Sequence, residues 1–569
     1  MKQIYTLFLL VLSFSSQAQN PANFTPATFN DPARLERIKN AMPVIEKMYK
    51  DFALANHFPG YAYGIVVDGE LLYKGAEGYA NLEEKIPATT SSMFRVASMS
   101  KSFTSLAILH LRDAGKLKLD DPVEMYIPAL KGQGLTNDAP AITIRHLMSH
   151  SAGFPEDNPW GDRQLADSEK DLTDLISGKL SFSNVAGTEY EYSNLGFAML
   201  GYIIHKASGL SYDVYIQKNI LNPLGMNATT YEYTIIQKDK FAFGYRYINN
   251  IWRKEAPLKD GIYGAMGGMI TSIDMFGKYV AMHEAAWPER NEKESLPVKR
   301  SSIREMHQPA RFISLNPSYR FPSGKKLALT GSYTYGLRWT IDAENKKNIG
   351  HSGGLPGFGS NWQFLPDYGV GVILFANVTY APTALFNTMV IDTLLRMGTV
   401  DLQPRILPAS ETLKNAQAKL TMLLPSWKNA AASNLFAENF FDDYKIDALI
   451  KEATSIFNAA GELHGTGDMI PENELRGYYY LHAKNPSNLS VLSDMANSIG
   501  VDGDRLLEWM RVPEHEQRFQ QELAFAHSLP ISGFPSLVLE VDGLRYPIAL
   551  DYQVPQVALD DIKRVRADY

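Results

Sequence analysis

The stretch SMSKSFTSLAILHLRDAG, residues 98–115, decides how the fold and the chemistry of this chain are read. It opens with an S-x-x-K tetrad, Ser98 to Lys101, continues as an apolar run from Phe103 to Leu111, and ends at Gly115, a helix-stop residue. The pattern predicts a helix with Ser98 at its N-terminus and Lys101 one turn later on the same face. The lysine is then close enough to take the serine proton, and the helix end stabilises the developing negative charge. We expect Ser98 to be an activated nucleophile.

The tetrad alone is a weak signal, because the same chain repeats it at Ser323-Gly324-Lys325-Lys326. That second copy lies in a Pro/Gly/Lys-rich stretch with no helical pattern after it, which favours Ser98. The alternative interpretation of Ser98 and Lys101 is a helix N-cap followed by a surface lysine.

Tyr192-Ser193-Asn194 supplies a phenol and an amide just before the apolar helix predicted over Leu195–Ile204. A phenol relays a proton if a neighbouring ammonium lowers its pKa, and an amide orients a lysine and a substrate carbonyl. We expect both side chains to face the nucleophile. Tyr79-Ala80-Asn81 and Tyr247-Ile248-Asn249 match the same tripeptide, and a loop tyrosine with a capping asparagine is the alternative.

His351-Ser352-Gly353-Gly354 precedes a predicted pair of strands, and its glycines let backbone approach a ligand closely. We expect an edge strand that carries His351 and presents the Gly354 N–H beside the Ser98 N–H, as two donors to an oxyanion. The alternative is a hydrogen-bonded structural histidine. Lys259-Asp260-Gly261 lacks the following strands, so it is a weaker candidate for this wall of the site.

The flanking sequence predicts one antiparallel sheet built from both ends of a long domain. A helix is expected after Asn30-Asp31-Pro32, with apolar residues repeating at Leu35, Ile38, Met42, Ile45 and Tyr49. Tyr61–Val67 and Glu70–Gly75 form a hairpin pattern around Asp68-Gly69, and Trp362–Leu365 and Val370–Asn377 flank Pro366-Asp367. A mainly helical stretch from Met99 to Ile220 separates these ends. The fold class is therefore α/β (α+β): an antiparallel sheet flanked by helices, with a helical subdomain and a cleft between the two.

Composition limits the possible partners and the compartment. The chain has 569 residues, a formal net charge of −7 and no cysteine, so we expect no nucleic-acid partner, no disulfide and no thiolate chemistry. Lys2, the apolar run Ile4–Phe14 and Ser16-Gln17-Ala18 predict a signal peptide over residues 1–18. No later stretch has the apolar length of a membrane span. We expect a secreted protein of the bacterial periplasm that acts on a small molecule or a peptide, with cell-wall fragments as candidates; its oligomeric state is left open.

Three motifs in this order, Ser98-x-x-Lys101, Tyr192-x-Asn194 and His351-x-Gly353, resemble the active-site motifs of class C β-lactamases and of their D,D-peptidase and esterase relatives. The similarity runs from about Arg34 to Leu394, and includes the segments Leu147–Gly153, Pro223–Met226 and Gly267–Thr271. The resemblance implies a β-lactamase/transpeptidase-like fold, acyl-enzyme chemistry without a metal or other cofactor, catalytic roles for Ser98, Lys101, Tyr192, Asn194 and His351, and oxyanion or substrate contacts from Ser98, Gly353 and Gly354.

Histidine stands at position 351, where the β-lactamase pattern has a lysine in K-[ST]-G. Because an imidazole of ordinary pKa is mostly neutral at pH 7, it anchors a substrate carboxylate less reliably than a lysine does. We therefore expect a serine hydrolase of esters, amides or D-amino-acid peptides more than an efficient β-lactamase. The alternative is a receptor that binds penicillins or a protein partner without turnover.

The remaining chain is predicted to form separate parts. The hydrolase domain is expected over 31–400, a small α+β accessory domain over 401–490 with a helix at Glu438–Ala459, and a helix and hairpin segment over 491–569. The last part, with Ile531–Leu537, resembles the second half of thioredoxin-like disulfide oxidoreductases, although the cysteine-bearing half is absent. A turn before a strand is the simpler interpretation of Phe534-Pro535.

His146 and His150 have the spacing of a metal-binding pair on a helix, but no glutamate stands in the H-E-x-x-H position. We expect capping or supporting roles for both histidines, and no metal site.

Overall fold

The computed structural model describes residues 24–158, 160–396, 401–437, 439–460, 463–479, 481–483, 537–541 and 544–548. The chain divides into two compact units, Pro26–Ile406 and a second unit that includes Leu407–Tyr569. Each is described by itself. The signal peptide predicted over 1–18, the end of the hydrolase domain predicted at residue 400 and the Ile531–Ser536 part of the thioredoxin-like segment lie outside the described residues.

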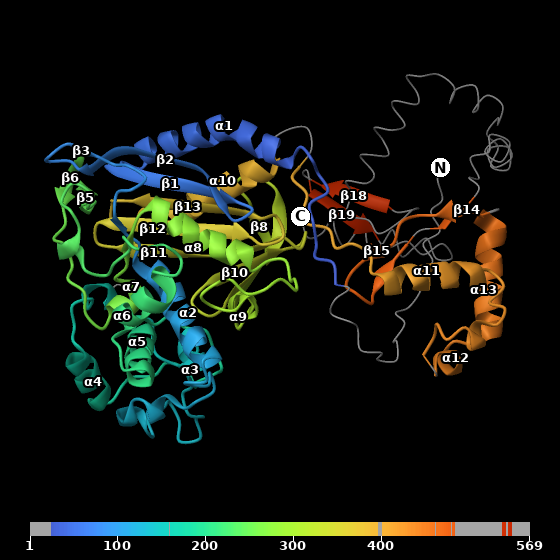
Figure 1. Ribbon diagram of the computed structural model, residues 1–569, viewed down its shortest axis with the longest axis horizontal. Coiled ribbons are helices and arrows are strands. Elements are labelled where there is room, and N and C mark those ends of the chain that lie inside the picture. Colours follow the sequence, from blue (N-terminus) through green and yellow to red (C-terminus); the bar gives the residue numbers. More distant parts are fainter. Residues whose placement is uncertain are drawn as a thin grey trace. The chain divides into compact units, whose positions relative to one another are not determined.

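The first unit is built on a nine-stranded antiparallel sheet (Figure 1). Its order is β3-β2-β1-β13-β12-β11-β10-β9-β8. The strands are β1 (Gly60–Val67), β2 (Glu70–Asn81), β3 (Ile86–Pro87), β8 (Arg311–Arg320), β9 (Lys326–Tyr333), β10 (Arg338–Asp342), β11 (Lys347–Leu355), β12 (Phe358–Leu365) and β13 (Val370–Ala376). Because β1 pairs with β13, with Tyr61 opposite Ala376, the two ends of the unit meet in one sheet as the sequence predicts.

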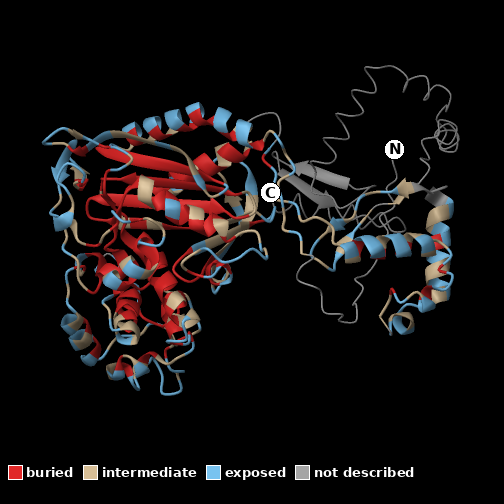
Figure 2. Ribbon diagram, in the orientation of Figure 1, coloured by how far each residue is buried: buried red, intermediate tan, exposed pale blue. Residues whose placement is uncertain are grey.

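Helices cover both faces of this sheet. α1 (Arg34–Ala55) and α10 (Thr383–Arg396) lie on one face, and α8 (Ile273–Ala285) lies on the other (Figure 1). The alternation of strand side chains separates the two cores: Trp362 and Phe364 of β12 join the core on the α8 side, whereas Leu365 joins the core of α1 and α10. Figure 2 shows the central strands buried along most of their length.

The predicted helical subdomain fills the chain between these strands. Its helices are α2 (Ser100–Asp113), α3 (Ile144–Met148), α4 (Glu169–Ser177), α5 (Asn194–Ser208), α6 (Tyr212–Ile216) and α7 (Gly264–Gly267). α2 packs against α5, α7 and the 3₁₀ turn Ala97–Met99 that precedes it. Short strand pairs β4 (Phe94–Arg95) with β7 (Ile270–Thr271) and β5 (Tyr245–Ile248) with β6 (Ile251–Lys254), together with α9 (Arg300–Met306), complete the unit.

Two local predictions need correction. Leu35 was expected on the apolar face of the first helix, but it is 45% exposed. The helix starts at Arg34, and the side chains that it buries against the sheet are those of Arg34, Ile38 and Ala41. The histidine-bearing strand β11 is not an edge strand, since it lies between β12 and β10. However, β10 pairs with it only as far as Gly350, so among the described residues His351–Leu355 has no strand partner on that side.

The second unit contains α11 (Glu411–Leu423), α12 (Phe440–Asp443), α13 (Ile446–Ala460) and the strand pairs β14 (Leu463–Thr466) with β17 (Leu481–Ala483) and β15 (Ile470–Pro471) with β16 (Gly477–Tyr478). The helix predicted over Glu438–Ala459 is thus two helices, with Tyr444 and Lys445 between them. The predicted hairpin is confirmed as β18 (Leu537–Val541) and β19 (Leu544–Ile548), with Val541 opposite Leu544. No helix in the described parts of the chain is long and apolar enough to cross a bilayer.

Candidate active site

Ser98 lies in the middle of the 3₁₀ turn that leads into α2. Ala97, just before it, has a φ of +50°, in the left-handed region that costs free energy for a residue with a side chain. The turn is held on both sides, because the Ser100 hydroxyl donates to Ala97 O (2.7 Å) and accepts from the Met269 N–H (3.1 Å). The chain thus fixes the nucleophile in a strained turn, with 8% of Ser98 exposed.

Lys101 is fully buried one helical turn after Ser98, as the sequence predicts. Its Nζ lies 3.1 Å from Ser98 Oγ, 2.7 Å from Asn194 Oδ1 and 2.9 Å from the Met266 carbonyl oxygen. Burial lowers the pKa of Lys101 to about 7, although the negative charges of Asp162 and Asp157 oppose the shift. A large fraction of this amine is therefore neutral at pH 7 and has a lone pair for the Ser98 proton.

Tyr192 and Asn194 stand at the start of α5, with Ser193 as its N-cap accepting from the Gly196 N–H. The Tyr192 ring centroid is 4.8 Å from Lys101 Nζ. Burial raises the pKa of Tyr192 well above its usual value, and its hydrogen bond with Ser98 only partly opposes this. The condition set by the sequence argument, a phenol pKa lowered by an ammonium, is therefore not met. Tyr192 is a protonated donor, and Lys101 is the group able to act as base.

Two residues that sequence reasoning missed hold Asn194 in place, Asp157 through its backbone and Asn158 through its side chain. Asp157 accepts hydrogen bonds from the Asn194 and Leu195 N–H groups (2.7 and 2.8 Å), a favourable place for a carboxylate at a helix N-terminus. Asn158 Oδ1 accepts from Asn194 Nδ2 (2.7 Å). With its nitrogen occupied in this way, Asn194 turns its oxygen to Lys101.

His150 supports the Tyr192–Asn194 segment. Its Nδ1 accepts from the Ser193 N–H (3.1 Å), and its ring lies 4.3 Å from the Tyr192 ring. His146 instead closes a capping box on α3, with its Nδ1 accepting from the Thr143 N–H. The expected capping and supporting roles are confirmed.

His351 reaches the site, with its ring 6.4 Å from that of Tyr192. Its Nδ1 lies 2.6 Å from Ser352 O, and since a carbonyl only accepts, Nδ1 carries the proton. Its Nε2 therefore accepts from the Tyr333 hydroxyl at 3.0 Å. Burial, followed by the charges of Lys101 and Arg338, lowers the pKa of His351 to about 3. The ring is neutral, and both of its nitrogens are already engaged within the protein.

Gly353 brings β11 against the nucleophile turn. A Cβ at this position would overlap the Val96 carbonyl oxygen, to which the Ser360 hydroxyl also donates (2.8 Å). Only glycine allows this approach. At Gly354 a Cβ would lie 2.6 Å from the ring of Tyr380, whose hydroxyl donates to Asp162 (2.9 Å). Asp162 and Tyr380 are further residues that the sequence motifs do not reveal.

The alternative motifs lie elsewhere. Ser323–Lys325 lies in the exposed turn between β8 and β9, with Lys326 as the first residue of β9, and Tyr79–Asn81 ends strand β2. Tyr247 and Ile248 belong to β5, with Asn249 in its turn. Asp260 of Lys259–Gly261 accepts from the Tyr212 hydroxyl (2.6 Å).

Comparison with known proteins agrees with this fold. The chain matches the family described as Beta-lactamase over residues 44–394, more than half of its length, and belongs to that family. It is 30% identical over 312 residues to Penicillin-binding protein 4* of Bacillus subtilis (51% of this chain, 62% of the relative) and 25% identical over 345 residues to Protein flp of Staphylococcus aureus (59% and 64%). The matched region thus spans less than two thirds of either relative.

A solved structure, the octameric penicillin-binding protein homologue from Pyrococcus abyssi, is similar with a TM-score of 0.53 and 25% identity, covering 67% of this chain and 81% of that chain. The predicted β-lactamase/transpeptidase-like fold is therefore confirmed. The family supports a serine hydrolase type of function for this chain.

Proposed function

We propose that this protein hydrolyses ester or amide bonds through an acyl enzyme on Ser98. The observation that carries the proposal is the position of Lys101, whose amine is 3.1 Å from the serine oxygen and has a pKa lowered to about 7 by burial. A base poised near the working pH is the most effective proton acceptor.

The steps follow from the protonation states. Neutral Lys101 takes the Ser98 proton while Ser98 Oγ forms a bond to the substrate carbonyl carbon, and the backbone N–H groups of Ser98 and Gly354 are suited to bind the resulting oxyanion. The proton then moves from Lys101 to the leaving group by way of the Tyr192 hydroxyl. In deacylation, Lys101 takes a proton from a water molecule while that water attacks the acyl carbonyl carbon, and the Ser98 oxygen leaves and regains its proton. Asn194 holds the Lys101 amine in place.

The substrate class follows from the charges around the site. His351 is neutral and cannot replace a lysine as a carboxylate anchor. Arg338 of β10 is exposed and has no carboxylate within ion-pair distance in the described parts of the chain, and its charge acts on both Tyr192 and His351. Its Nη2 lies 3.5 Å from the Tyr190 hydroxyl. We assign to Arg338 the carboxylate of a D-amino-acid peptide, which favours peptides of the cell-wall type over neutral esters.

Paired substrates test this assignment. Hydrolysis of a peptide ending in D-alanyl-D-alanine should exceed that of its C-terminal amide, and Arg338→Ala should reduce kcat/KM for the acid by about ten- to a hundredfold, as expected for loss of a charge-assisted hydrogen bond, while leaving the amide unchanged. Arg338→Lys serves as the matched variant that keeps the charge. Equal rates on both peptides would reject Arg338 as the anchor, and a stable acyl adduct without turnover would favour the receptor function.

We also propose export of the chain, on the strength of Lys2, the apolar run Ile4–Phe14 and the small residues Ser16 and Ala18. In a bacterial host, protein recovered from the periplasm should begin directly after Ala18 when its mass is measured. Full-length protein confined to the cytoplasm would contradict export.

A further inference from the structure

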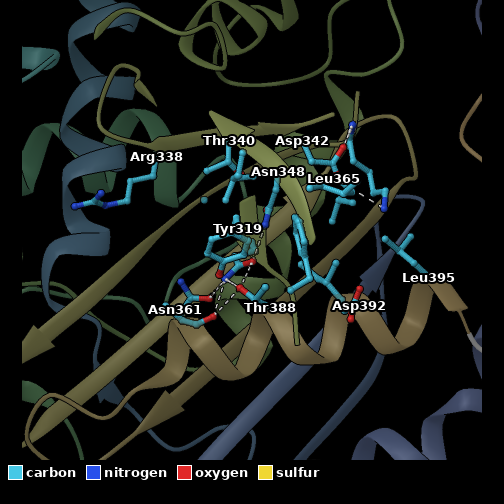
Figure 3. Close-up of a pocket in the computed structure, with 18 of the residues that line it drawn as sticks. Tyr319, Arg338, Thr340, Asp342, Asn348, Asn361, Leu365, Thr388, Asp392 and Leu395 are labelled. Atoms are coloured by element: carbon cyan, nitrogen blue, oxygen red, sulfur yellow. Dashed lines mark hydrogen bonds and ion pairs between the residues drawn. The ribbon is translucent and has the colours of Figure 1, made fainter. Parts of the chain in front are cut away.

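A second cavity lies on the face of the sheet that α10 covers. It has a volume of about 220 Å³ and is lined by the β8–β9 hairpin, by β10 to β12 and by α10 (Figure 3). Asn361 and Gln363 of β12 line it, whereas Trp362 between them belongs to the core on the opposite face. His351 and Ser352 are also among the lining residues, so one end of the cavity reaches the strand that carries His351.

The cavity is mainly apolar. Leu327 and Leu329, two residues apart on β9, share a face, as do Ile391 and Leu395, four residues apart on α10. Leu365 of β12 joins them. Such a surface favours the apolar part of a ligand over water.

The charged residues around the cavity are paired with one another. Lys325 pairs with Glu344, Lys346 with Asp342 (3.6 Å) and Glu344 (3.2 Å), and Arg396 with Asp392 (2.9 Å). The remaining cation, Arg338, points away from Asn348 and Thr388 in Figure 3. Arg338 lines only the far end, so the part of the cavity around Asn348 and Thr388 offers a charged ligand no free counter-charge among the described residues, which favours a neutral occupant there.

The polar floor of the cavity is a chain of side-chain amides. Asn348 Nδ2 donates to Gln363 Oε1 (2.7 Å), Gln363 Nε2 donates to Asn361 Oδ1 (3.1 Å), and Asn361 Nδ2 donates to the His351 carbonyl oxygen (3.2 Å). Thr388 of α10 adds a further bond to Gln363 (Figure 3). Asn348 Oδ1, at the other end, has no partner among the described residues, and a buried acceptor without a donor costs free energy.

We propose that this cavity binds a small neutral amphiphile, an aliphatic body with an N–H or O–H donor. The aliphatic body lies against the leucines and Ile391, and the donor satisfies Asn348 Oδ1 after the Asn348 amide turns about its soft terminal torsion, which weakens its hydrogen bond to Gln363 in exchange. The ligand then rests against the amide chain that ends on the strand of His351.

The probe for the test is octanamide, compared with N,N-dimethyloctanamide, which has no donor. Binding is measured by calorimetry on the full chain carrying Ser98→Ala, which cannot form an acyl enzyme, so the result does not depend on the proposed function. Leu329→Trp fills the cavity, and Leu315→Trp on the neighbouring strand, where Leu315 is 59% exposed and does not line the cavity, is the matched control.

We expect saturable binding of octanamide that Leu329→Trp weakens at least tenfold and Leu315→Trp leaves unchanged. Octanamide should bind more tightly than its dimethyl analogue, and Asn348→Leu, which keeps the size of the side chain, should abolish that preference. Absence of saturable binding, or full binding to the Leu329→Trp chain, would overturn the site. Equal binding of the two amides to the chain with Asn348 intact would overturn the role of Asn348.

Discussion

The protonation of Lys101 gives the most demanding prediction. An ammonium with the usual pKa of 10.5 is neutral in about one molecule in 3,000 at pH 7, whereas a pKa of about 7 makes about half of the molecules neutral. If neutral Lys101 is the base, the rate at which a fluorophosphonate labels Ser98 should rise about tenfold per pH unit below pH 7 and level off above it. At pH 5 the rate should be about a hundredfold below the plateau.

The pH dependence of the labelling rate is measured by quenching the reaction at a series of times and determining the labelled fraction by intact-mass spectrometry. Lys101→Met has a similar volume and no amine, and it should lose the pH midpoint together with about 10²–10⁴ of the rate, while its far-ultraviolet circular dichroism stays that of the parent. Because Asp162 interacts with Lys101, the midpoint belongs to the pair. A labelling rate that keeps rising past pH 9 would refute a base with a lowered pKa, and a Lys101→Met chain labelled at the parental rate would refute any role for the amine.

The other predictions concern the neighbours of the nucleophile. Asn194→Asp places a carboxylate where an amide oxygen now lies 2.7 Å from Lys101 Nζ, so the midpoint of labelling should move at least one pH unit higher; an unmoved midpoint would contradict the contact. His351→Asn should reduce the pH dependence of stability: the folded-state pKa of this histidine is lowered to about 3, so its protonation in the unfolded chain removes about 2 kcal/mol of stability between pH 6.5 and 5. In urea titrations the variant should lose about that much less than the parent over this range, while the buried His150, His283 and His307 contribute equally to both. Gly353→Ala should push β11 from the nucleophile turn and slow labelling at least tenfold, whereas Gly196→Ala, where a Cβ makes only ordinary contacts, should label normally.

Much of the fold could be predicted because its signals are local. Asp68-Gly69 between two β-rich runs predicted the β1–β2 hairpin, and the S-x-x-K tetrad before an apolar run predicted the start of α2. Their periodicity and turn chemistry depend on residues a few positions apart. The exposure of Leu35 was missed because a run of apolar residues does not by itself define which stripe of a helix meets the sheet.

The candidate site could be predicted only in its motif residues. Asp157, Asn158 and Tyr333 act on Asn194 and His351 from distant parts of the sequence, so no spacing rule points to them. The direction of a pKa shift is likewise set by packing. Burial decides that Tyr192 stays protonated and that His351 stays neutral, and burial at these positions follows from the folded arrangement of β9, β11 and α5.

Intact-mass spectrometry after exposure to a fluorophosphonate tests the central claim most directly, with Ser98→Ala as the control and a penicillin as a second reagent. We predict one fluorophosphonate adduct per parent chain and none on the Ser98→Ala chain. A penicillin adduct in addition would support the alternative function of a penicillin-binding protein. A parent chain that takes up neither reagent, or an adduct that survives in Ser98→Ala, would contradict Ser98 as the nucleophile of this protein.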